Sequence, residues 1–325
     1  MDNRPILVTG TAGFIGSHVA EALLGRGRHV VGVDNFDPYY DLELKRRNVN
    51  HTLGVAPNDA YHLVEADICD ADAMRRVFAA HRPEGVIHLA AKAGVRPSIA
   101  DPVGYARANV LGTSVLLEEA RRAGCERFVM ASSSSVYGNR AKVPFAETDD
   151  VSEPISPYAA TKRACELLGH AHWHLTRMPT ACLRFFTVYG PRQRPDLAIN
   201  LFMNKALKGE SIQMFGDGTS SRDYTFIDDI VRGVVASYDR VDRHGFRIWN
   251  LGGSSPVSLK ELIGTVQRVT GKELAIRQAA AQPGDVERTF ADLTRAGAEL
   301  DFRPTTPLAE GVARQWQWIR SNQQR

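Results

Sequence analysis

Residues 6–19 read ILVTGTAGFIGSHV, a short apolar run, a turn with three glycines and the start of an amphipathic run. The glycines are Gly10, Gly13 and Gly16, one at every third position. Glycines at such a turn let the backbone approach a pyrophosphate closely, and the free N–H groups of the first helical turn meet its negative charge. The stretch therefore predicts a strand, a tight turn and a helix that together bind a dinucleotide.

A second apolar run, residues 29–34 with the sequence HVVGVD, ends in an acidic residue. Asp34 follows Gly16 at close to the ~20-residue spacing expected for a carboxylate that binds the adenosine ribose hydroxyls. A 2'-phosphate would meet a like charge at Asp34, so the pattern favours NAD over NADP. Because glycines also simply end strands, the dinucleotide site is predicted from the combination and not from the glycines alone.

Apolar runs and helical patterns alternate along the first part of the chain. Expected strands occupy residues 6–8, 30–33, 62–65, 86–89, 128–131 and 181–186, and expected helices include residues 14–24, 71–80, 109–123 and 158–175. This order predicts a doubly wound, Rossmann-like α/β fold, with a parallel sheet and helices on both faces. Ligands of such a sheet bind beyond the carboxyl ends of its strands. The residues at these positions are Gly10, Asp34, Asp67, Ala90 and Ser133.

After residue 186 the sequence changes to turns rich in glycine and proline with short helical patterns, which indicates a smaller second lobe. Residues 247–251 form a later apolar run that we expect to return to the main sheet, so that the lobes interleave. We expect an NAD-binding domain of residues 1–180 and about 225–253. A substrate-binding lobe of about 181–224 and 254–325 completes the chain.

Composition excludes several classes of partner. The 40 basic and 37 acidic residues give a net charge of +3, too small an excess to predict nucleic-acid binding. A hydrophobic content of 43% is ordinary for a globular protein, and neither a signal peptide nor a membrane span is expected. The four cysteines lack CxxC spacing, so we expect reduced thiols and a cytoplasmic protein. The histidines show no spacing typical of metal ligands, so no metal is expected.

Residues 156–162, SPYAATK, place a phenol and an ammonium one helical turn apart. Tyr158 and Lys162 share a helix face because they are four residues apart. A free tyrosine titrates near pH ~10, but a cation beside the phenolate lowers its pKa toward neutrality, where the phenolate can act as a base. Such pairs also occur on ordinary surface helices, so the catalytic interpretation depends on the NAD site upstream.

Further motifs follow the expected strands: Asp67-Ile68, residues 89–91 (LAA) and residues 132–138 (SSSSVYG). Together with the glycines, Asp34 and the Tyr158–Lys162 pair, they resemble the extended short-chain dehydrogenase/reductase superfamily over essentially the whole chain. Residues 34–41 (DNFDPYYD), 93–96 (AGVR) and 184–196 (RFFTVYGPRQRPD) are similar to the UDP-glucuronate 4-epimerases. One departure is Arg192-Gln193, where many plant-type members carry Trp-Gly.

The resemblance implies roles for individual residues. At the NAD it places Gly10, Gly13, Phe14, Ile15 and Gly16 on the pyrophosphate, Asp34 and Asn35 on the adenosine ribose, Asp67 and Ile68 beside adenine, Lys92 and Asn109 along the nicotinamide half, and Leu89, Ala90, Phe185, Tyr158 and Lys162 among the other contacts. At the substrate it places Arg96, Ser133, Ser134, Ser135, Tyr158, Thr187, Arg194, Arg222 and Arg288. Arg222 and Arg288 would bind the UDP diphosphate, because a guanidinium can form two parallel hydrogen bonds to phosphate oxygens. The alternative is that these two arginines are solvated charges on the protein surface.

The implied reaction is a 4-epimerisation. Tyr158, as phenolate, takes the proton of the 4-hydroxyl while hydride leaves for NAD, Lys162 supports the phenolate and bonds the nicotinamide ribose, and Ser133 orients the hydroxyl. The 4-keto sugar then turns about its diphosphate linkage and takes the hydride back on its opposite face. NAD therefore stays bound, and no net redox change results.

The run Ser132–Ser135 distinguishes this reaction from those of related enzymes. Sugar-nucleotide dehydratases of the superfamily carry an acidic pair where Ser134 and Ser135 stand, and uronate decarboxylases keep a glutamate at the second position. Hydroxyls cannot remove a C5 proton at neutral pH, but they suit hydrogen bonding to a C5 carboxylate. We therefore expect Ser134, Ser135 and Thr187 to hold that carboxylate and to prevent loss of carbon dioxide, while Ser132 is structural.

The expected substrate is UDP-glucuronate, and the alternative is a 4-epimerase for UDP-glucose or a UDP-N-acetylhexosamine. A non-catalytic NAD-sensing protein of the same fold would have no need of Ser133, Tyr158 and Lys162. A homodimer is expected, paired through the helices at 109–123 and 158–175. Cys165, Leu167 and Leu168 face either that interface or the chain's own core.

Overall fold

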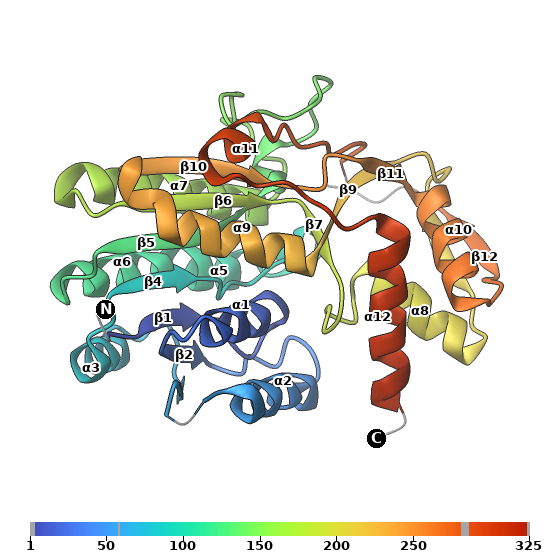
Figure 1. Cartoon of the computed structure of the whole chain (residues 1–325). Helices are drawn as coiled ribbons and strands as arrows, with labels where there is room; N and C mark the ends of the chain where they lie inside the picture. Colours follow the sequence, from blue (N-terminus) through green and yellow to red (C-terminus); the bar gives the residue numbers. More distant parts are fainter. Residues whose placement is uncertain (1–3, 58, 281–285, 324–325) are drawn as a thin grey trace.

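The computed structural model describes residues 4–57, 59–280 and 286–323. Within these ranges a sheet of seven parallel strands forms the centre of the molecule (Figure 1). The strands are β1 (Ile6–Thr9), β2 (Val30–Asp34), β3 (Tyr61–Glu65), β4 (Gly85–His88), β5 (Arg127–Ser133), β6 (Thr180–Phe185) and β10 (Phe246–Leu251). Their order across the sheet is β10-β6-β5-β4-β1-β2-β3, so the predicted doubly wound fold is confirmed.

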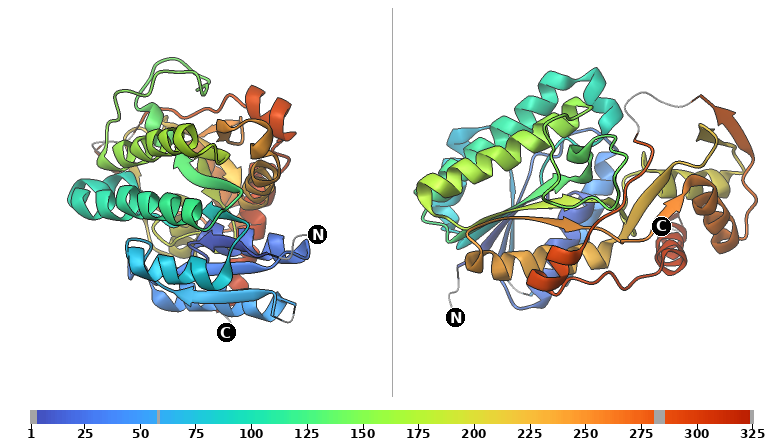
Figure 2. Two further views of the ribbon diagram at one scale, coloured as in Figure 1. Left: turned by 90° about the vertical axis from the view of Figure 1, so that its left-hand side faces the viewer. Right: turned by 90° about the horizontal axis from the view of Figure 1, so that it is seen from above.

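Helices cover both faces of the sheet, which is why its central strands are continuous apolar runs. The helices α1 (Phe14–Gly25) and α9 (Ile227–Arg240) pack together on one face. The helices α3 (Ala71–His81), α6 (Gly112–Arg122) and α7 (Pro157–Thr176) form the layer on the other face, and Figure 2 shows the two layers from the side. α2 (Leu42–Val55) lies outside α1.

The helices follow their local sequence signals closely. α7 begins after Ser156, whose hydroxyl accepts a hydrogen bond from the N–H of Ala159, and Pro157 occupies its first turn. The helix predicted at 109–123 corresponds to α6, which spans Gly112–Arg122. Residues Ala106–Leu111 form a π-helical turn before it. The short helices α4 (Val95–Ala100) and α5 (Pro102–Tyr105) precede this turn.

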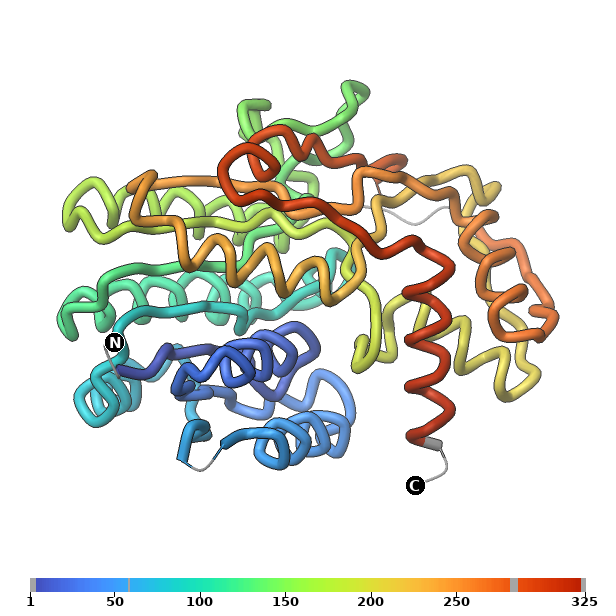
Figure 3. The backbone as a smooth tube through the Cα atoms, viewed as in Figure 1, coloured from blue at the N-terminus to red at the C-terminus, as the bar shows by residue number. Residues whose placement is uncertain are grey.

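The second lobe lies beyond the carboxyl edge of the main sheet, on the right of Figure 1. It contains β7 (Thr187–Tyr189), β8 (Ile212–Phe215), β9 (Ser221–Phe226), β11 (Pro256–Ser258), β12 (Ile276–Ala279), α8 (Ala198–Lys208), α10 (Leu259–Thr270) and α12 (Leu308–Gln323). The tube in Figure 3 leaves the main sheet after β6, comes back through α9 and β10, and leaves again for β11, α10 and β12. It then passes back beside β10 before it reaches α12. β10 pairs with β6 in parallel, as the run at 247–251 predicts, and α11 (Thr294–Leu300) packs on β10.

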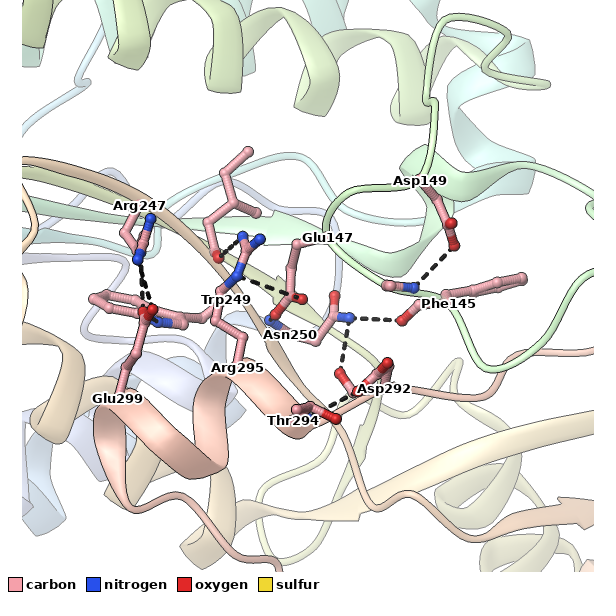
Figure 4. Close-up of polar contacts among 12 residues, drawn as sticks. Phe145, Glu147, Asp149, Arg247, Trp249, Asn250, Asp292, Thr294, Arg295 and Glu299 are labelled. Atoms are coloured by element: carbon pink, nitrogen blue, oxygen red, sulfur yellow. Dashed lines mark hydrogen bonds and ion pairs between the residues drawn. The ribbon is translucent and has the colours of Figure 1, made fainter.

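Asn250, near the end of β10, joins three segments that are distant in the sequence (Figure 4). Its side-chain amide donates to the carbonyl oxygens of Phe145 at 2.8 Å and Asp292 at 3.1 Å, and its backbone N–H donates to Glu147 at 2.8 Å. Its Oδ1 accepts a hydrogen bond from the hydroxyl of Tyr137 at 2.7 Å. The hydrogen bond between Tyr137 and Asn250 therefore attaches the turn Ser134–Tyr137 to β10.

Among the helices of the described ranges, none combines the length and apolar character that crossing a bilayer requires. The same residues contain no group of three or more His, Cys, Asp or Glu side chains placed to hold a metal ion.

Candidate active site

A cleft of about 480 Å³ opens at the carboxyl ends of the main strands. The predicted site residues that line it are Gly10, Gly13, Phe14, Ile15, Gly16, Asp34, Asn35, Asp67, Ile68, Leu89, Ala90, Lys92, Ser133, Ser134, Ser135, Tyr158, Lys162, Phe185, Thr187 and Arg194. Parallel strands bring residues that are far apart in the sequence to this single edge.

The glycine turn leaves space and hydrogen-bond donors at the start of α1. Gly10 has a φ of +76°, and a Cβ built on it would lie 2.8 Å from the backbone nitrogen of Ala90. A Cβ on Gly16 would lie 2.0 Å from the carbonyl oxygen of Gly10. The N-cap residue is Gly13, which has no side chain to satisfy the first N–H groups of the helix. These residues therefore fit the pyrophosphate of a dinucleotide.

Asp34 closes the next strand beside this turn. Its carboxylate accepts hydrogen bonds from the backbone N–H groups of Ala12 at 3.0 Å and Phe36 at 2.9 Å. Burial raises the pKa of Asp34, although the charge of Lys45 and the two N–H donors oppose that shift. The carboxylate thus ties the glycine turn to the end of β2, where a ribose is expected.

Asp67 follows β3 at the same edge. It accepts hydrogen bonds from the N–H of Cys69 at 2.8 Å and from Arg107 at 3.2 Å. Burial alone would raise the pKa of Asp67, but these donors and the charge of Arg107 outweigh it, so the pKa lies below its ordinary value. Asp67 is therefore an anionic acceptor at the border of the cleft.

Tyr158 and Lys162 both line the cleft from α7, as their spacing predicts. Lys162 is buried and donates from Nζ to the carbonyl oxygen of Ala131 at 2.7 Å, which holds its ammonium at the end of β5. The ring of Tyr158 meets the buried ring of Tyr105 edge to face, with centroids 6.1 Å apart. The phenol is thus supported by packing while its ring borders the cleft.

The four serines divide into two kinds of environment. Ser132 is buried and donates to Glu166 at 2.7 Å, which agrees with the structural role expected for it. Ser133 ends β5, donates from Oγ to Oγ of Ser135 at 3.1 Å and accepts from the N–H of Ser135 at 3.1 Å. Ser133, Ser134 and Ser135 line the cleft together with Thr187, so the hydroxyls gather at one end of it.

Asn109 lies one layer behind the cleft and is 1% exposed. It accepts a hydrogen bond from the N–H of Lys92 at 2.9 Å and donates to the carbonyl oxygen of Lys92 and to Oγ1 of Thr161, both at 3.0 Å. Its contact with the nicotinamide half stays a prediction, and in the structure it positions the backbone of Lys92.

Arg96, Arg222 and Arg288 line a second, larger cavity of about 1430 Å³. Thr187 borders both cavities, so the second one adjoins the hydroxyl end of the first. The guanidinium of Arg96 lies 4.7 Å from the ring centre of Phe215, and that of Arg222 donates to the carbonyl oxygen of Ser221 at 3.0 Å. The three arginines therefore line the cavity that adjoins the hydroxyl end of the first cleft, and none of them lines the first cleft itself.

Sequence reasoning gave no role to Tyr39, Tyr40 or Lys45, which also line the first cleft. Lys45 donates to the carbonyl oxygen of Asp37 at 2.9 Å and lies 5.1 Å from the ring centre of Tyr40. The aromatic pair at residues 39–40, five residues after the acidic end of β2, was the signal that could have found the two tyrosines, and no signal marked Lys45.

Residues 6–252 match the model of the NAD dependent epimerase/dehydratase family. The chain belongs to this family. A relative from Rhizobium meliloti (strain 1021), named a probable UDP-glucuronate 4-epimerase, is 40% identical and is covered over 98% of both chains.

Two solved structures of family relatives share the fold over nearly the full length. UDP-glucuronic acid 4-epimerase from Bacillus cereus, in complex with UDP-glucuronic acid and NAD, has a TM-score of 0.90 and 34% identity, with 98% of this chain and 99% of that chain covered. UDP-glucose 4-epimerase from Thermotoga maritima, with UDP-glucose, has a TM-score of 0.89 and 33% identity at the same coverage. Sequence and structure comparisons therefore agree on a sugar-nucleotide epimerase fold.

Proposed function

We propose that this protein is an NAD-dependent isomerase that converts UDP-glucuronate to UDP-galacturonate by 4-epimerisation. One observation carries the proposal: Tyr158, Lys162 and Ser133 open on the same cleft as a group of further hydroxyls. Among the described residues of the cleft, the acidic side chains are Asp34 at the end of β2, Asp37 after β2 and Asp67 after β3. In the part of the chain that the structure describes, the end of the cleft beside Tyr158 thus has hydroxyls and no carboxylate.

NAD, when bound, supplies the chemistry of the reaction by accepting a hydride from C4 and returning it to the opposite face of the sugar. Gly10, Gly16 and Asp34 would hold it, because their backbone space and acceptor groups fit a dinucleotide. Tyr158 takes the proton of the 4-hydroxyl and gives it back after the ketone has turned. Lys162, held by the carbonyl of Ala131, keeps a positive charge near the phenolate, and this favours the charged form.

The hydroxyls of Ser134, Ser135 and Thr187 would bind the C5 carboxylate. A 4-keto uronate is a β-keto acid, which loses carbon dioxide when the carboxylate bond lies perpendicular to the ketone. Fixed donors prevent that orientation without the cost of a buried countercharge. The hydrogen bonds between Ser133 and Ser135 and the attachment of Tyr137 to Asn250 keep this turn in place.

The diphosphate of the substrate would lie in the second cavity. Arg222 and Arg288 line it, and each can offer paired N–H donors to phosphate oxygens. Arg96 enters the same cavity from α4, on the side of the main sheet. A UDP-sugar lying across Thr187 would then place its uridine in the second lobe and its C4 beside Tyr158.

The second candidate is 4-epimerisation of UDP-glucose or a UDP-N-acetylhexosamine, which the likeness to the Thermotoga maritima enzyme favours. The purified protein, incubated without added NAD, is given UDP-glucuronate and UDP-glucose separately, and the products are identified by NMR. UDP-galacturonate from UDP-glucuronate supports the first candidate. Conversion of UDP-glucose alone replaces it with the second, and conversion of neither sugar contradicts both.

The proposed assembly is a homodimer, paired through α6 and α7. Leu167 on α7 is 54% exposed and Leu111, directly before α6, is 46% exposed, whereas Cys165 is buried. A contiguous exposed apolar patch marks an interaction site, and we propose that Leu111 and Leu167 belong to such a patch. We place the protein in the cytoplasm, where the four cysteines, all free, stay reduced.

The proposed domain division is residues 1–180 and about 225–253 for NAD, and about 181–224 and 254–325 for the UDP-sugar. The packing of α9 and β10 with the main sheet supports the return at 225–253. Two substitutions in the full-length protein test the division. Asp34→Ala should lower the NAD content of the purified protein, and Arg222→Ala should weaken binding of UDP at full NAD content. Loss of NAD from the Arg222 variant would contradict the division.

A further inference from the structure

The loop between β7 and α8 carries the departure from the plant-type pattern, Arg192-Gln193, immediately before Arg194. The three side chains have different surroundings. Arg192 contacts α1, Gln193 contacts α8 and α12, and Arg194 lines the cleft. The conformation of Arg194 is therefore defined by contacts on two sides of the loop.

Gln193 is buried and takes part in a chain of amide hydrogen bonds. Its Nε2 donates to the carbonyl oxygen of Val188 at 3.0 Å, and its Oε1 accepts from Nε2 of Gln315 at 2.8 Å and from the N–H of Asn200 at 3.1 Å. Gln315 lies on α12 with 0% exposure, and its Oε1 accepts from the N–H of Gly190 at 2.9 Å. Both glutamines thus have donor and acceptor satisfied, which fixes the loop at both of its ends.

Arg192 joins the same loop to the helix that begins at the glycine turn. Its Nη1 and Nη2 donate to the two carboxylate oxygens of Glu21 at 2.8 and 3.1 Å, and the side chain of Arg192 is 9% exposed. Two parallel bonds restrain a guanidinium in direction as well as distance. Arg192 also has a φ of +65°, so the backbone turns sharply at this residue.

Arg194 lines the cleft, whereas Arg192 contacts α1. Arg194 forms paired hydrogen bonds with Asp196 at 3.0 and 2.8 Å, donates to the carbonyl oxygen of Ala93 at 3.2 Å, and lies 5.0 Å from the ring centre of Tyr39. These contacts hold Arg194 in the cleft wall beside Ala93 and Tyr39. Asp196 neutralises the charge of the Arg194 guanidinium. We therefore expect the position of this side chain to affect substrate binding more than its charge does.

We propose that Gln315, Gln193 and Arg192 are positioning residues that hold Arg194 in the cleft wall and thereby set the affinity for the UDP-sugar. The last helix then contributes to substrate binding through Gln315. This residue does not line the cleft, and it acts through Gln193, which precedes Arg194 in the loop. The inference rests on the proposed function and adds to it residues that position the substrate-binding side chain Arg194.

The test compares Gln315→Met with Gln317→Met, a matched control on the same helix whose side chain is exposed. Loss of the two buried hydrogen bonds of the Gln315 amide is expected to raise KM for UDP-glucuronate about tenfold, while kcat stays within about twofold because Ser133, Tyr158 and Lys162 are untouched. The control should leave both constants unchanged. Arg192→Gln, with the exposed Arg46→Gln as its control, should raise KM in the same way, and Arg192→Lys should recover part of the loss.

Binding of UDP-glucuronate to the NAD-loaded proteins is measured in parallel by calorimetry, with NAD content and the urea midpoint as checks of folding. A weaker Kd in Gln315→Met and Arg192→Gln, with full NAD content, supports the inference. Wild-type Kd and KM in both variants overturn it, as does a fall in kcat that accompanies the rise in KM. If the wild-type protein binds UDP-glucuronate but does not epimerise it, the proposed function fails while the Kd comparison still decides the role of the loop.

Discussion

Arg184 on β6 and Glu166 on α7 form a buried ion pair near the carboxyl edge of the sheet. Two parallel hydrogen bonds join them, Nε to Oε1 at 2.8 Å and Nη2 to Oε2 at 2.9 Å, and each side chain is 1% exposed. Glu166 also accepts from Ser132 and from Arg163. Burial alone would raise the pKa of Glu166, but these donors outweigh it and the pKa lies below its ordinary value.

The pair connects α7 and β5, which carry the proposed catalytic residues, with the neighbouring strand β6. Glu166 follows Lys162 by one turn of α7, and Arg184 on β6 is the register partner of Ser132 on β5. The guanidinium also lies 4.7 Å from the ring centre of Tyr137, in the turn that holds Ser134 and Ser135. α7, β5 and β6 are therefore held in one arrangement by a single buried carboxylate.

Glu166→Gln should destabilise the protein by about 3 to 5 kcal/mol, because it leaves the buried Arg184 charge uncompensated. Urea unfolding at neutral pH measures the change in the free energy of unfolding. Glu118→Gln is the control, since Glu118 pairs with Arg121 and Arg122 on the surface and should cost no more than about 1 kcal/mol. Equal effects of the two substitutions would contradict the importance of the buried pair.

Tyr158→Phe should lower turnover by about 10² to 10⁴, the usual loss on removing a general acid–base group. The ring remains, so its contact with Tyr105 and the NAD content of the purified protein should not change. Steady-state kinetics and the absorbance of released NAD measure the two quantities. Full activity of this variant would remove Tyr158 from the mechanism.

The double substitution Ser134→Ala and Thr187→Ala should increase the proportion of pentose nucleotide formed from UDP-glucuronate. Both hydroxyls line the cleft beside Ser133, and without them the carboxylate of the ketone intermediate can turn to the orientation that loses carbon dioxide. The ratio of pentose to hexuronate products is read by NMR. An unchanged ratio would show that these hydroxyls do not hold the carboxylate.

His88 makes stability depend on pH. Burial and the nearby charge of Lys162 lower the pKa of His88 to about 3, and the neutral ring contacts Thr9 at 2.8 Å and Thr113 at 3.0 Å. Between pH ~6.5 and ~3 the unfolded chain binds the proton that the folded one excludes, so this histidine makes stability fall as the pH falls through that window.

The free energy of unfolding should therefore fall by about 2 kcal/mol less in His88→Gln than in the wild-type protein when the pH is lowered from 7 to 5. Urea unfolding of each protein at the two pH values measures this fall. The absolute stability of the variant does not enter this comparison. Replacement of the exposed His174 by Gln should leave the dependence as it is. Equal slopes for all three proteins would mean that His88 is not kept neutral by the fold.

The dimer proposal predicts that Leu111→Glu together with Leu167→Glu yields a monomer by light scattering. Both leucines are exposed in the single chain, so the substitutions should leave the unfolding midpoint of the monomer nearly unchanged. A wild-type protein that is monomeric at micromolar concentration would contradict the proposal directly.

Much of the catalytic edge could be predicted because its signals are local. The glycine spacing requires close backbone approach, Asp34 ends a buried strand, and Tyr158 and Lys162 need only the helical repeat to share a face. The predicted helix 109–123 begins three residues before α6, because residues 109–111 belong to the π-helical turn Ala106–Leu111, in which Asn109 contacts Lys92 and Thr161. No periodic pattern of apolar residues marks such a turn.

The sequence by itself determined the alternation of strands and helices, the edge at which ligands bind and the chemistry of the groups that lie there. Only the tertiary structure decided which buried polar partners meet, such as Glu166 with Arg184 and Gln193 with Gln315. The physical reason is that backbone periodicity acts over a few residues, whereas a buried polar group takes whatever partner the packing of distant elements brings within hydrogen-bond distance.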